Sequence, residues 1–148
     1  MNTDTKIFIA CDHAAFEEKQ MIIGYLNSLK GYTVEDLGTH TKDSVAYPVY
    51  AQKLCETLLK NQNQDSSRGI LMCGSGIGVS MAANRYKGIR AARCVTVNDA
   101  KLSREHNNAN VLCLGSRINS VEELIAMTKI WLQTDFLGGR HQERVDLF

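Results

Sequence analysis

Short apolar runs alternate with longer amphipathic stretches along the whole chain. The runs are short enough for strands and most contain β-branched side chains. They cover residues 6–11, 32–37, 69–73, 89–95 and 111–114. Between and after them, the apolar residues follow helical spacing at 17–30, 48–60, 76–86, 99–106 and 121–133. Because strand and helix patterns alternate, we predict an α/β fold with parallel strands and right-handed crossovers.

Two of the predicted helices carry start signals. Pro48, the only proline in the chain, suits a first helical turn. Ser120 and Glu123 have capping-box spacing at the start of 121–133. We expect one face of that last helix to point inward, with the side chains of Leu124, Ile125, Thr128, Trp131 and Leu132.

Length and charge limit the class of protein. The 148 residues, 44% of them hydrophobic, suit one domain, 1–148, with one sizeable core. The net charge of +1 argues against nucleic-acid or membrane partners, which need a basic surface. No apolar run approaches the ~20 residues that span a bilayer. The N-terminal residues do not resemble a secretory signal, so we expect a cytoplasmic protein.

The cysteines and histidines do not form a metal or disulfide pattern. Five cysteines at wide spacings, without Cys-x-x-Cys, do not suit a disulfide scaffold or a zinc ribbon. We expect Cys11, Cys55, Cys94 and Cys113 to be small buried hydrophobes. The four histidines are scattered without metal-ligand spacing, so we expect no metal.

Polar residues follow each predicted strand. In open α/β sheets, ligands bind at the carboxyl ends of the strands. Groups that bind anions or move protons therefore meet at one edge of this sheet: Asp12, His13, Gly38, Thr39, His40, Tyr47, the loop 74–78, Asn98, Asp99, Ser116 and Arg117. This concentration favours a ligand site over a purely structural role.

The turn Cys73-Gly74-Ser75-Gly76-Ile77-Gly78 joins a predicted strand to a helix. Its glycines let the backbone approach a ligand, and amides at a helix start favour anions. The same field favours thiolate over thiol at Cys73, which suits a base or a nucleophile. Val79 stands where a dinucleotide motif needs glycine, and no P-loop ending follows. A structural turn and a ligand site both remain open.

The other candidates also have structural alternatives. Asp12 and His13 suit an acid/base pair or a phosphate contact, but Asp12 also suits a helix N-cap. His106 suits a favourable cation at a helix end, and His40 is expected to be a loop residue. Arg140 and Arg144, four residues apart, share a helix face that suits a phosphate or a solvated basic surface.

Taken together, the motifs resemble those of the type B ribose-5-phosphate isomerase family, in order and over nearly the whole chain. They are Cys11-Asp12-His13, Tyr47-Pro48, Cys73 to Gly78, Ser103 to Asn107, Leu114 to Arg117 and Gly139 to Val145. The resemblance implies a Rossmann-like three-layer α/β/α sandwich with a five-stranded parallel sheet. It also implies a homodimer or tetramer that interconverts D-ribose 5-phosphate and D-ribulose 5-phosphate without a cofactor or metal.

By position, the resemblance assigns roles to individual residues. Cys73 is the base and His106 opens the sugar ring. The remaining assignments are sugar contacts (Asp12, His13, Asn107), a pocket wall (Tyr47), backbone amides for the enediolate (Gly74, Ser75, Gly76, Ile77, Gly78) and phosphate ligands (Arg117, Arg140, Arg144). Residues 135–148 then form a phosphate-binding and dimer-contact tail.

Two positions distinguish this chain within the family. Another branch has a glutamate base at the position of Val79, so this chain resembles the cysteine branch. Ala46 stands where an acidic residue is common, which leaves local sugar contacts open.

The position of His106 follows from topology. The helix after the fourth strand starts at the ligand edge and runs away from it for ~12 Å at 1.5 Å per residue. We therefore expect His106 and Asn107 to lie far from Cys73 of the same chain and to complete the site of a second subunit.

Two alternative functions remain. One is isomerisation of a six-carbon sugar, allose 6-phosphate or galactose 6-phosphate, although His106 and the Gly-Arg-His-Gln tail favour the pentose. The other is a non-catalytic sugar-phosphate-binding module.

Overall fold

The computed structural model describes residues 4–61 and 66–148. Five strands form one sheet in the order β2-β1-β3-β5-β4, and every neighbouring pair is parallel. The strands are β1 (Thr5–Cys11), β2 (Tyr32–Asp36), β3 (Ser67–Cys73), β4 (Ala91–Arg93) and β5 (Val111–Gly115). The predicted parallel α/β fold is confirmed.

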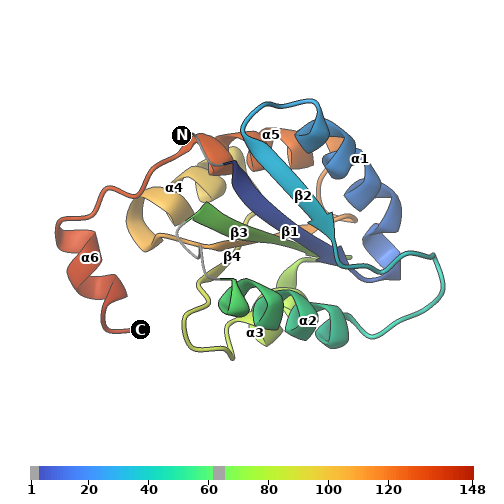
Figure 1. Ribbon diagram of the computed structural model, residues 1–148, viewed down its shortest axis with the longest axis horizontal. Helices are drawn as coiled ribbons and strands as arrows, with labels where there is room; N and C mark the ends of the chain where they lie inside the picture. The colour runs from blue at the N-terminus through green and yellow to red at the C-terminus, as the bar shows by residue number, and fades with distance from the viewer. Residues whose placement is uncertain (1–3, 62–65) are drawn as a thin grey trace.

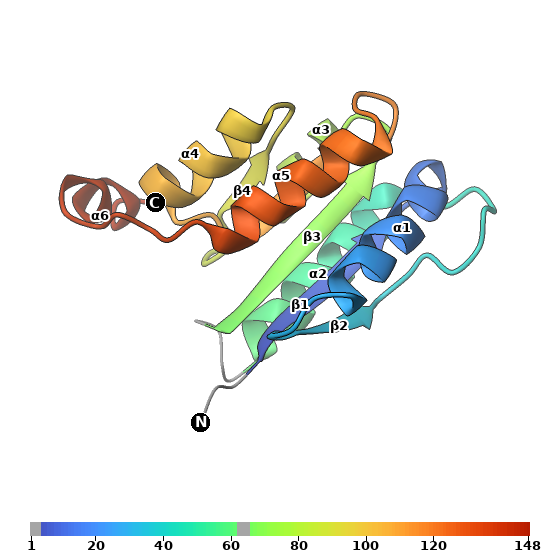
Figure 2. The same ribbon diagram turned by 90° about the horizontal axis from the view of Figure 1, so that it is seen from above.

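Helices cover both faces of this sheet. They are the short 3-10 helix η1 (His13–Ala15), α1 (Phe16–Asn27), α2 (Tyr47–Lys60), α3 (Ile77–Ala83), α4 (Val97–Asn107), α5 (Val121–Gln133) and α6 (Arg140–Val145). Helices α1, α4 and α5 lie on one face, and α2 and α3 on the other (Figures 1 and 2). The molecule therefore has the three layers that the resemblance implied.

The side chains of each strand alternate between the two faces of the sheet, and helices bury both faces. In β1, Ile7 and Ile9 pack under α1 and α5, whereas Phe8 and Ala10 pack under α2. Successive side chains of a strand point to opposite faces, so a strand covered on both sides reads as a continuous apolar run.

Four cysteines belong to these cores, as predicted: Cys11, Cys55, Cys94 and Cys113. Burial raises the pKa of Cys11, Cys55 and Cys94 to about 12, and raises that of Cys113 well above its usual range. These thiols therefore stay protonated near neutral pH.

Helix α5 has its predicted bounds, with two differences. The Ser120 hydroxyl accepts the Glu123 amide as a cap, but the Glu123 carboxylate accepts the Asn119 side chain instead of closing a capping box. Met127 is fully buried while Ile125 is only half-buried, because the sheet-facing row runs through Leu124, Met127 and Trp131. The complete capping box lies at α4, between Thr96 and Asp99.

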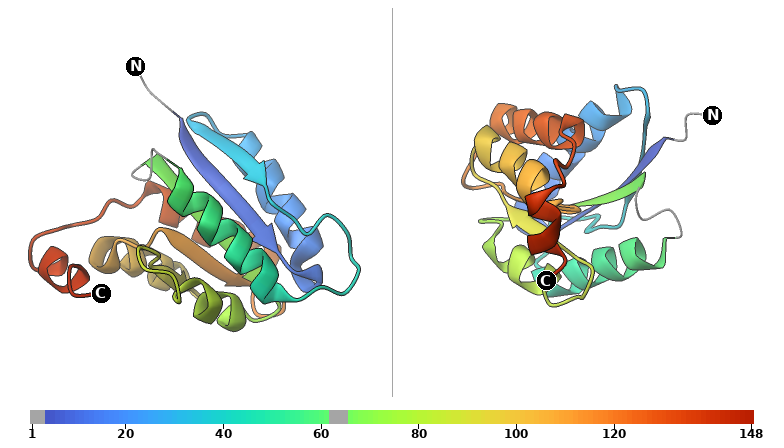
Figure 3. Two further views of the ribbon diagram at one scale, coloured as in Figure 1. Left: turned by 60° about the horizontal axis from the view of Figure 1, so that its bottom comes forward. Right: turned by 90° about the vertical axis from the view of Figure 1, so that its left-hand side faces the viewer.

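The C-terminal tail crosses the end of α4. The Leu137 amide donates to the Glu105 carbonyl at 3.1 Å, and α6 then lies beside α4 at the end of the molecule opposite the start of α2 (Figure 1; Figure 3). Because α6 lies beside α4, the predicted site residues of these two helices lie near each other.

Candidate active site

Hydrogen bonds hold the carboxyl ends of β1, β3 and β5 together. The Asp12 amide donates to Met72 at 3.2 Å, and the Ser116 amide to Cys73 at 2.9 Å. The Ser116 hydroxyl also donates to the Ala14 carbonyl at 2.8 Å. The residues that follow these strands therefore gather at one edge, as predicted.

Cys73 ends β3 at the start of the glycine-rich loop. Its side chain is buried, and its Sγ accepts the Gly76 amide at 3.1 Å. Gly76 has a left-handed φ of 76°, and an added Cβ would lie 3.0 Å from the Leu114 backbone. The loop therefore needs glycine here to aim its amide at the sulfur. Val79, buried one turn later, cannot ionise.

A second backbone amide of the glycine-rich loop also donates a hydrogen bond within the loop. The Ile77 amide donates to the Ser75 hydroxyl at 3.2 Å. The amides of Gly76 and Ile77, both assigned to the ligand by the resemblance, thus already have partners within the loop.

Tyr47 and Arg117 approach the loop where it has glycines. A Cβ on Gly78 would lie 2.5 Å from the Tyr47 ring, and one on Gly74 would lie 3.1 Å from the Arg117 guanidinium. Gly78 has no room for a Cβ unless the Tyr47 ring moves, whereas at Gly74 a shift of the flexible Arg117 side chain by a few tenths of an ångström would be enough. Tyr47, Cys73 and Arg117 are therefore brought together at one loop.

Asp12 and His13 adjoin this edge. Asp12 Oδ1 accepts the Ala14 amide at 3.0 Å, so its predicted capping role is confirmed. His13 Nδ1 accepts the Val45 amide at 3.1 Å. A neutral His13 ring consequently carries its proton on Nε2, which leaves a donor on that nitrogen.

Lys19 was not predicted as a contributor to this edge. It is fully buried, and its Nζ donates to Asp36 Oδ1 at 2.5 Å and to the Thr39 carbonyl at 2.6 Å. The segment Gly38–Thr39 in turn pairs with the Cys11 backbone on both sides. Lys19 thereby fixes the loop beside Asp12. Its spacing of three residues before Ile22, on the apolar face of α1, was the available signal.

Asp36 remains charged in this cluster. Burial raises its pKa, but the hydrogen bonds from Lys19 and the Gly38 amide outweigh burial, and the pKa is lowered overall. The pair is therefore ionic, which suits a buried lysine.

Arg93 is a second residue that the sequence pattern missed. Its Nε donates to the Ser75 carbonyl at 2.9 Å, so it holds the glycine loop from the side of β4. No motif marked it, because the contact joins segments that only the sheet brings together.

His106, Asn107, Arg140 and Arg144 lie elsewhere in the same chain. The His106 ring stacks on His141 with centroids 4.3 Å apart and planes at 12°. Helix α4 starts at the edge that carries Cys73, and its 11 residues put His106 ~15 Å further along at 1.5 Å per residue. The predicted residues therefore form two separate groups, with Arg140 and Arg144 in the second. His40 is an exposed loop residue.

The second group is electropositive. Partial desolvation lowers the pKa of His141, and the neighbouring charges of His106, Arg140 and Arg144 lower it further. This end of the molecule therefore suits an anion.

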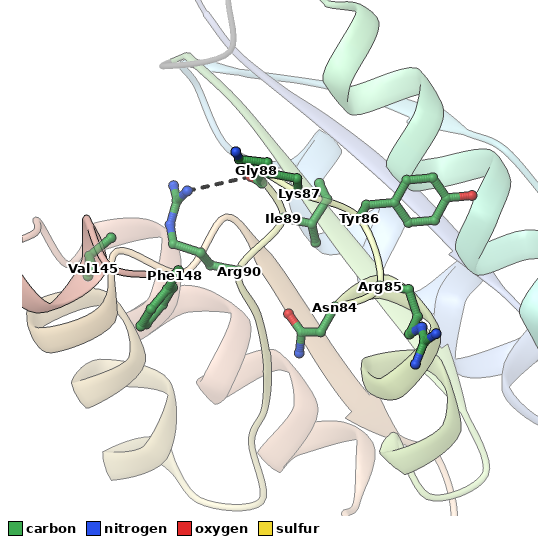
Figure 4. A pocket seen from close by; sticks show the side chains of 9 residues that line it. All are labelled: Asn84, Arg85, Tyr86, Lys87, Gly88, Ile89, Arg90, Val145 and Phe148. Atoms are coloured by element: carbon green, nitrogen blue, oxygen red, sulfur yellow. Dashed lines mark hydrogen bonds between the residues drawn. The ribbon is translucent and has the colours of Figure 1, made fainter.

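A pocket of about 740 Å³ lies beside the second group, between the α3–β4 loop and the C-terminus. Figure 4 shows Val145 and Phe148 on one side of it and Asn84 to Arg90 around the other. It does not include Cys73.

Among residues 4–61 and 66–148, no helix is long and apolar enough to cross a membrane. In the same ranges, no three side chains of His, Cys, Asp or Glu are grouped to hold a metal ion.

Known proteins resemble this chain over nearly its full length. The family model described as Ribose/Galactose Isomerase matches residues 7–148. Ribose-5-phosphate isomerase B of Escherichia coli is 40% identical, with 95% of this chain and 92% of that protein covered.

Two solved structures are also close. A ribose 5-phosphate isomerase from Thermotoga maritima has a TM-score of 0.90 at 48% identity, covering 97% of this chain and 96% of that one. Ribose-5-phosphate isomerase B from Mycoplasma genitalium, solved with bound ribulose-5-phosphate, has a TM-score of 0.92 at 42% identity, covering 98% and 94%. This chain, with its parallel sheet and glycine-rich loop at Cys73, belongs to the ribose/galactose isomerase family.

Proposed function

We propose that this chain interconverts D-ribose 5-phosphate and D-ribulose 5-phosphate, with Cys73 as the base. The observation that carries the proposal is the Gly76 amide on Cys73 Sγ, within a loop that Tyr47 and Arg117 approach closely. The amide stabilises a thiolate. The two relatives described as ribose 5-phosphate isomerases support the same reaction.

The reaction moves one proton between C2 and C1 and a second proton between their oxygens, O2 and O1. The Cys73 thiolate removes the proton from C2 of the open-chain aldose, and the electron pair of that C–H bond forms the enediolate C=C bond. The carbonyl π electrons move to O1, where donors stabilise the charge. O2 then loses its hydroxyl proton as its electrons form the C2=O2 bond, and the C=C electron pair takes the proton back from Cys73 at C1. O1 takes up the proton that O2 released, which gives the ketose. Carbon C1 is reduced as C2 is oxidised, so no external oxidant is required.

The remaining groups orient the substrate. His13 offers its Nε2 proton to a sugar oxygen, and Arg117, beside Gly74, binds the phosphate. A guanidinium suits a phosphate because it can donate two parallel hydrogen bonds. Anchoring the phosphate fixes the reacting carbons relative to Cys73.

A homodimer, alone or paired into a tetramer, unites the two groups. The partner subunit's His106 opens the ring, the partner's Asn107 contacts the sugar, and the partner's Arg140 and the partner's Arg144 bind the phosphate. Exposed apolar side chains on α3, α4 and the tail support such an interface: Ile77, Met81, Val97, Leu102, Leu137, Leu147 and Phe148. Residues 135–148 are then the phosphate-binding and dimer-contact tail of a single domain.

The test is conversion of ribose 5-phosphate by the purified protein in EDTA. We expect turnover by the wild type and a loss of ~10²–10⁴-fold in Cys73→Ala, the usual contribution of a general base. Cys94→Ala, which removes a buried thiol outside the loop, is the matched control and should keep activity.

Two results would contradict the proposal. Turnover of allose 6-phosphate or galactose 6-phosphate, with none of ribose 5-phosphate, would assign a six-carbon substrate. Binding of ribose 5-phosphate without turnover of any of these sugars would assign a binding module.

A further inference from the structure

A second polar pocket lies at the opposite edge of the sheet. Its volume is about 250 Å³, and three arginines line it: Arg68, Arg90 and Arg104. Arg68 lies at the start of β3, Arg90 directly precedes β4, and Arg104 comes from the last turns of α4. The pocket is therefore at the amino ends of the strands, away from Cys73 at their carboxyl ends.

Uncharged oxygens position the three guanidinium groups. Arg68 donates to the carbonyls of Trp131 and Leu132. Arg90 donates to the carbonyls of Asn108 and Gly88, the second bond being drawn in Figure 4. Arg104 donates to the carbonyls of Thr134 and Ala109 and to the Asn108 side chain. Arg68 donates through one terminal nitrogen, and Arg90 and Arg104 each donate through Nε and one terminal nitrogen. Within the described residues, the second terminal nitrogen of each arginine makes no such bond, so it is available to a ligand.

In the part of the chain that the structure describes, no ion pair neutralises the positive charge of this cluster. Among residues 4–61 and 66–148, no carboxylate lies within 4.0 Å of these guanidinium nitrogens. Burial, together with the charges of Arg68 and Arg90, lowers the pKa of Arg104 to about 10. Asp135 opposes this effect from a longer distance. Three like charges facing one cavity repel each other unless an anion lies between them.

Ser67 provides an independent observation. Its side chain lines the same pocket and is 2% exposed. Its hydroxyl has no hydrogen-bond partner in the part of the chain that the structure describes. An orphaned buried hydroxyl costs stability, so a partner is expected.

We propose that the pocket of Ser67, Arg68, Arg90 and Arg104 is a binding site for a small phosphate-bearing anion, separate from the substrate site. Convergent guanidinium groups match phosphate geometry. The Ser67 hydroxyl supplies a neutral donor, and the amide groups of Asn108 and Asn110 complete the polar lining.

The test is calorimetric titration with inorganic phosphate at constant ionic strength. It is run in an Arg140→Gln/Arg144→Gln background, which weakens phosphate binding at the proposed substrate site. We expect one phosphate per chain to bind in this background. Adding Arg90→Gln should weaken binding at least about tenfold, since a charge-assisted hydrogen bond is lost. Arg85→Gln, which removes an exposed arginine of the same loop on the far side of the Figure 4 pocket, should leave it unchanged.

Ser67→Ala keeps the test valid if Arg90→Gln fails to fold. Without phosphate, we expect this variant to unfold at a higher temperature than the wild type, because the substitution removes an orphaned hydroxyl. Added phosphate should raise the unfolding temperature of the variant by less than it raises that of the wild type. Absence of phosphate binding in the Arg140→Gln/Arg144→Gln background, or equal binding with Arg90→Gln, would overturn the proposal. Ribose 5-phosphate turnover by Arg90→Gln alone, expected to match the wild type, tests the proposed function separately.

Discussion

At the scale of single residues, Cys73 differs from the other cysteines in what its sulfur contacts. All five cysteines are buried, so burial alone does not distinguish the proposed base. Only Cys73 lies in a glycine-rich turn, and the Gly76 amide points at its sulfur. A donor aimed at a thiol favours the thiolate, which is the form that removes a proton.

This difference predicts selective alkylation. Under native conditions, iodoacetate should modify Cys73 before Cys11, Cys55, Cys94 and Cys113, whose raised pKa values keep them protonated. Mass spectrometry of tryptic peptides over time gives the order. Ribose 5-phosphate should slow the modification of Cys73 alone. Modification of another cysteine first would contradict the account.

The stacked histidines predict a measurable titration. His106→Ala should raise the pKa of His141, because it removes both burial and a neighbouring charge. Glu105→Gln is the opposing control and should lower the pKa of His141, since the Glu105 charge favours the protonated His141 ring. Proton NMR of the imidazole signals against pH measures both shifts. An unchanged pKa in His106→Ala would show that the rings do not stack in solution.

The lowered pKa of His141 also determines how the stability of the folded tail changes with pH. The unfolded chain binds a proton more readily at this residue than the folded chain does. Protonation therefore opposes folding of the tail as the pH falls below the ordinary histidine value of 6.5. The effect is lost at higher pH, where both states are neutral.

The sequence predicted some site residues better than others. Asp12, Tyr47, Cys73 and Arg117 were predictable because each follows a strand or opens a helix at the carboxyl edge, a position that topology fixes. Lys19 and Arg93 were not predicted, because their contacts join segments 20 and 18 residues apart. Residue type alone does not report such contacts.

At the scale of elements, helix α2 starts without a side-chain cap. Its N-cap residue is Ala46, with an extended backbone (φ −83°, ψ 119°). Pro48 has no amide proton, so the Val49 amide, which now donates to the Ala46 carbonyl at 3.2 Å, is the donor that an N-cap side chain would engage. The acidic residue expected at this position in the family would supply an acceptor.

Ala46→Asp should therefore stabilise the protein by about 1 kcal/mol, the usual value of an N-cap. Urea unfolding followed by circular dichroism measures the change. Ala46→Leu, which offers no acceptor, is the control and should not stabilise. Equal unfolding midpoints for Asp and Leu would contradict a missing cap.

Strands and long helices were predictable for a physical reason. Each is buried on at least one face, so its apolar period is visible in the sequence. Residues 121–133 have their predicted bounds because a capping serine marks the start. Strand β4 is shorter than predicted, since the Arg90 amide is bound by the Asn110 side chain and does not join the ladder. Such a competing side chain leaves no periodic signal.

At the scale of the whole molecule, one chain holds the proposed site residues in two groups at opposite ends. Cys73 and Arg117 lie at the carboxyl edge of the sheet, whereas His106 lies in the last turn of α4 and the two arginines lie in α6 beside that helix. Neither group contains both the proposed base and the proposed ring-opening residue. The proposed two-fold dimer, the commonest symmetric assembly, would place the first group of each subunit beside the second group of its partner and so form two complete sites.

Subunit mixing tests this claim most directly. Cys73→Ala and His106→Ala chains, each nearly inactive, are unfolded together in equal amounts, refolded and assayed with ribose 5-phosphate. Random pairing makes half of the dimers mixed, and each mixed dimer has one intact site of two. We therefore predict recovery of about a quarter of the wild-type activity. A refolded, dimeric mixture with no more activity than the separate variants would contradict a site shared between subunits.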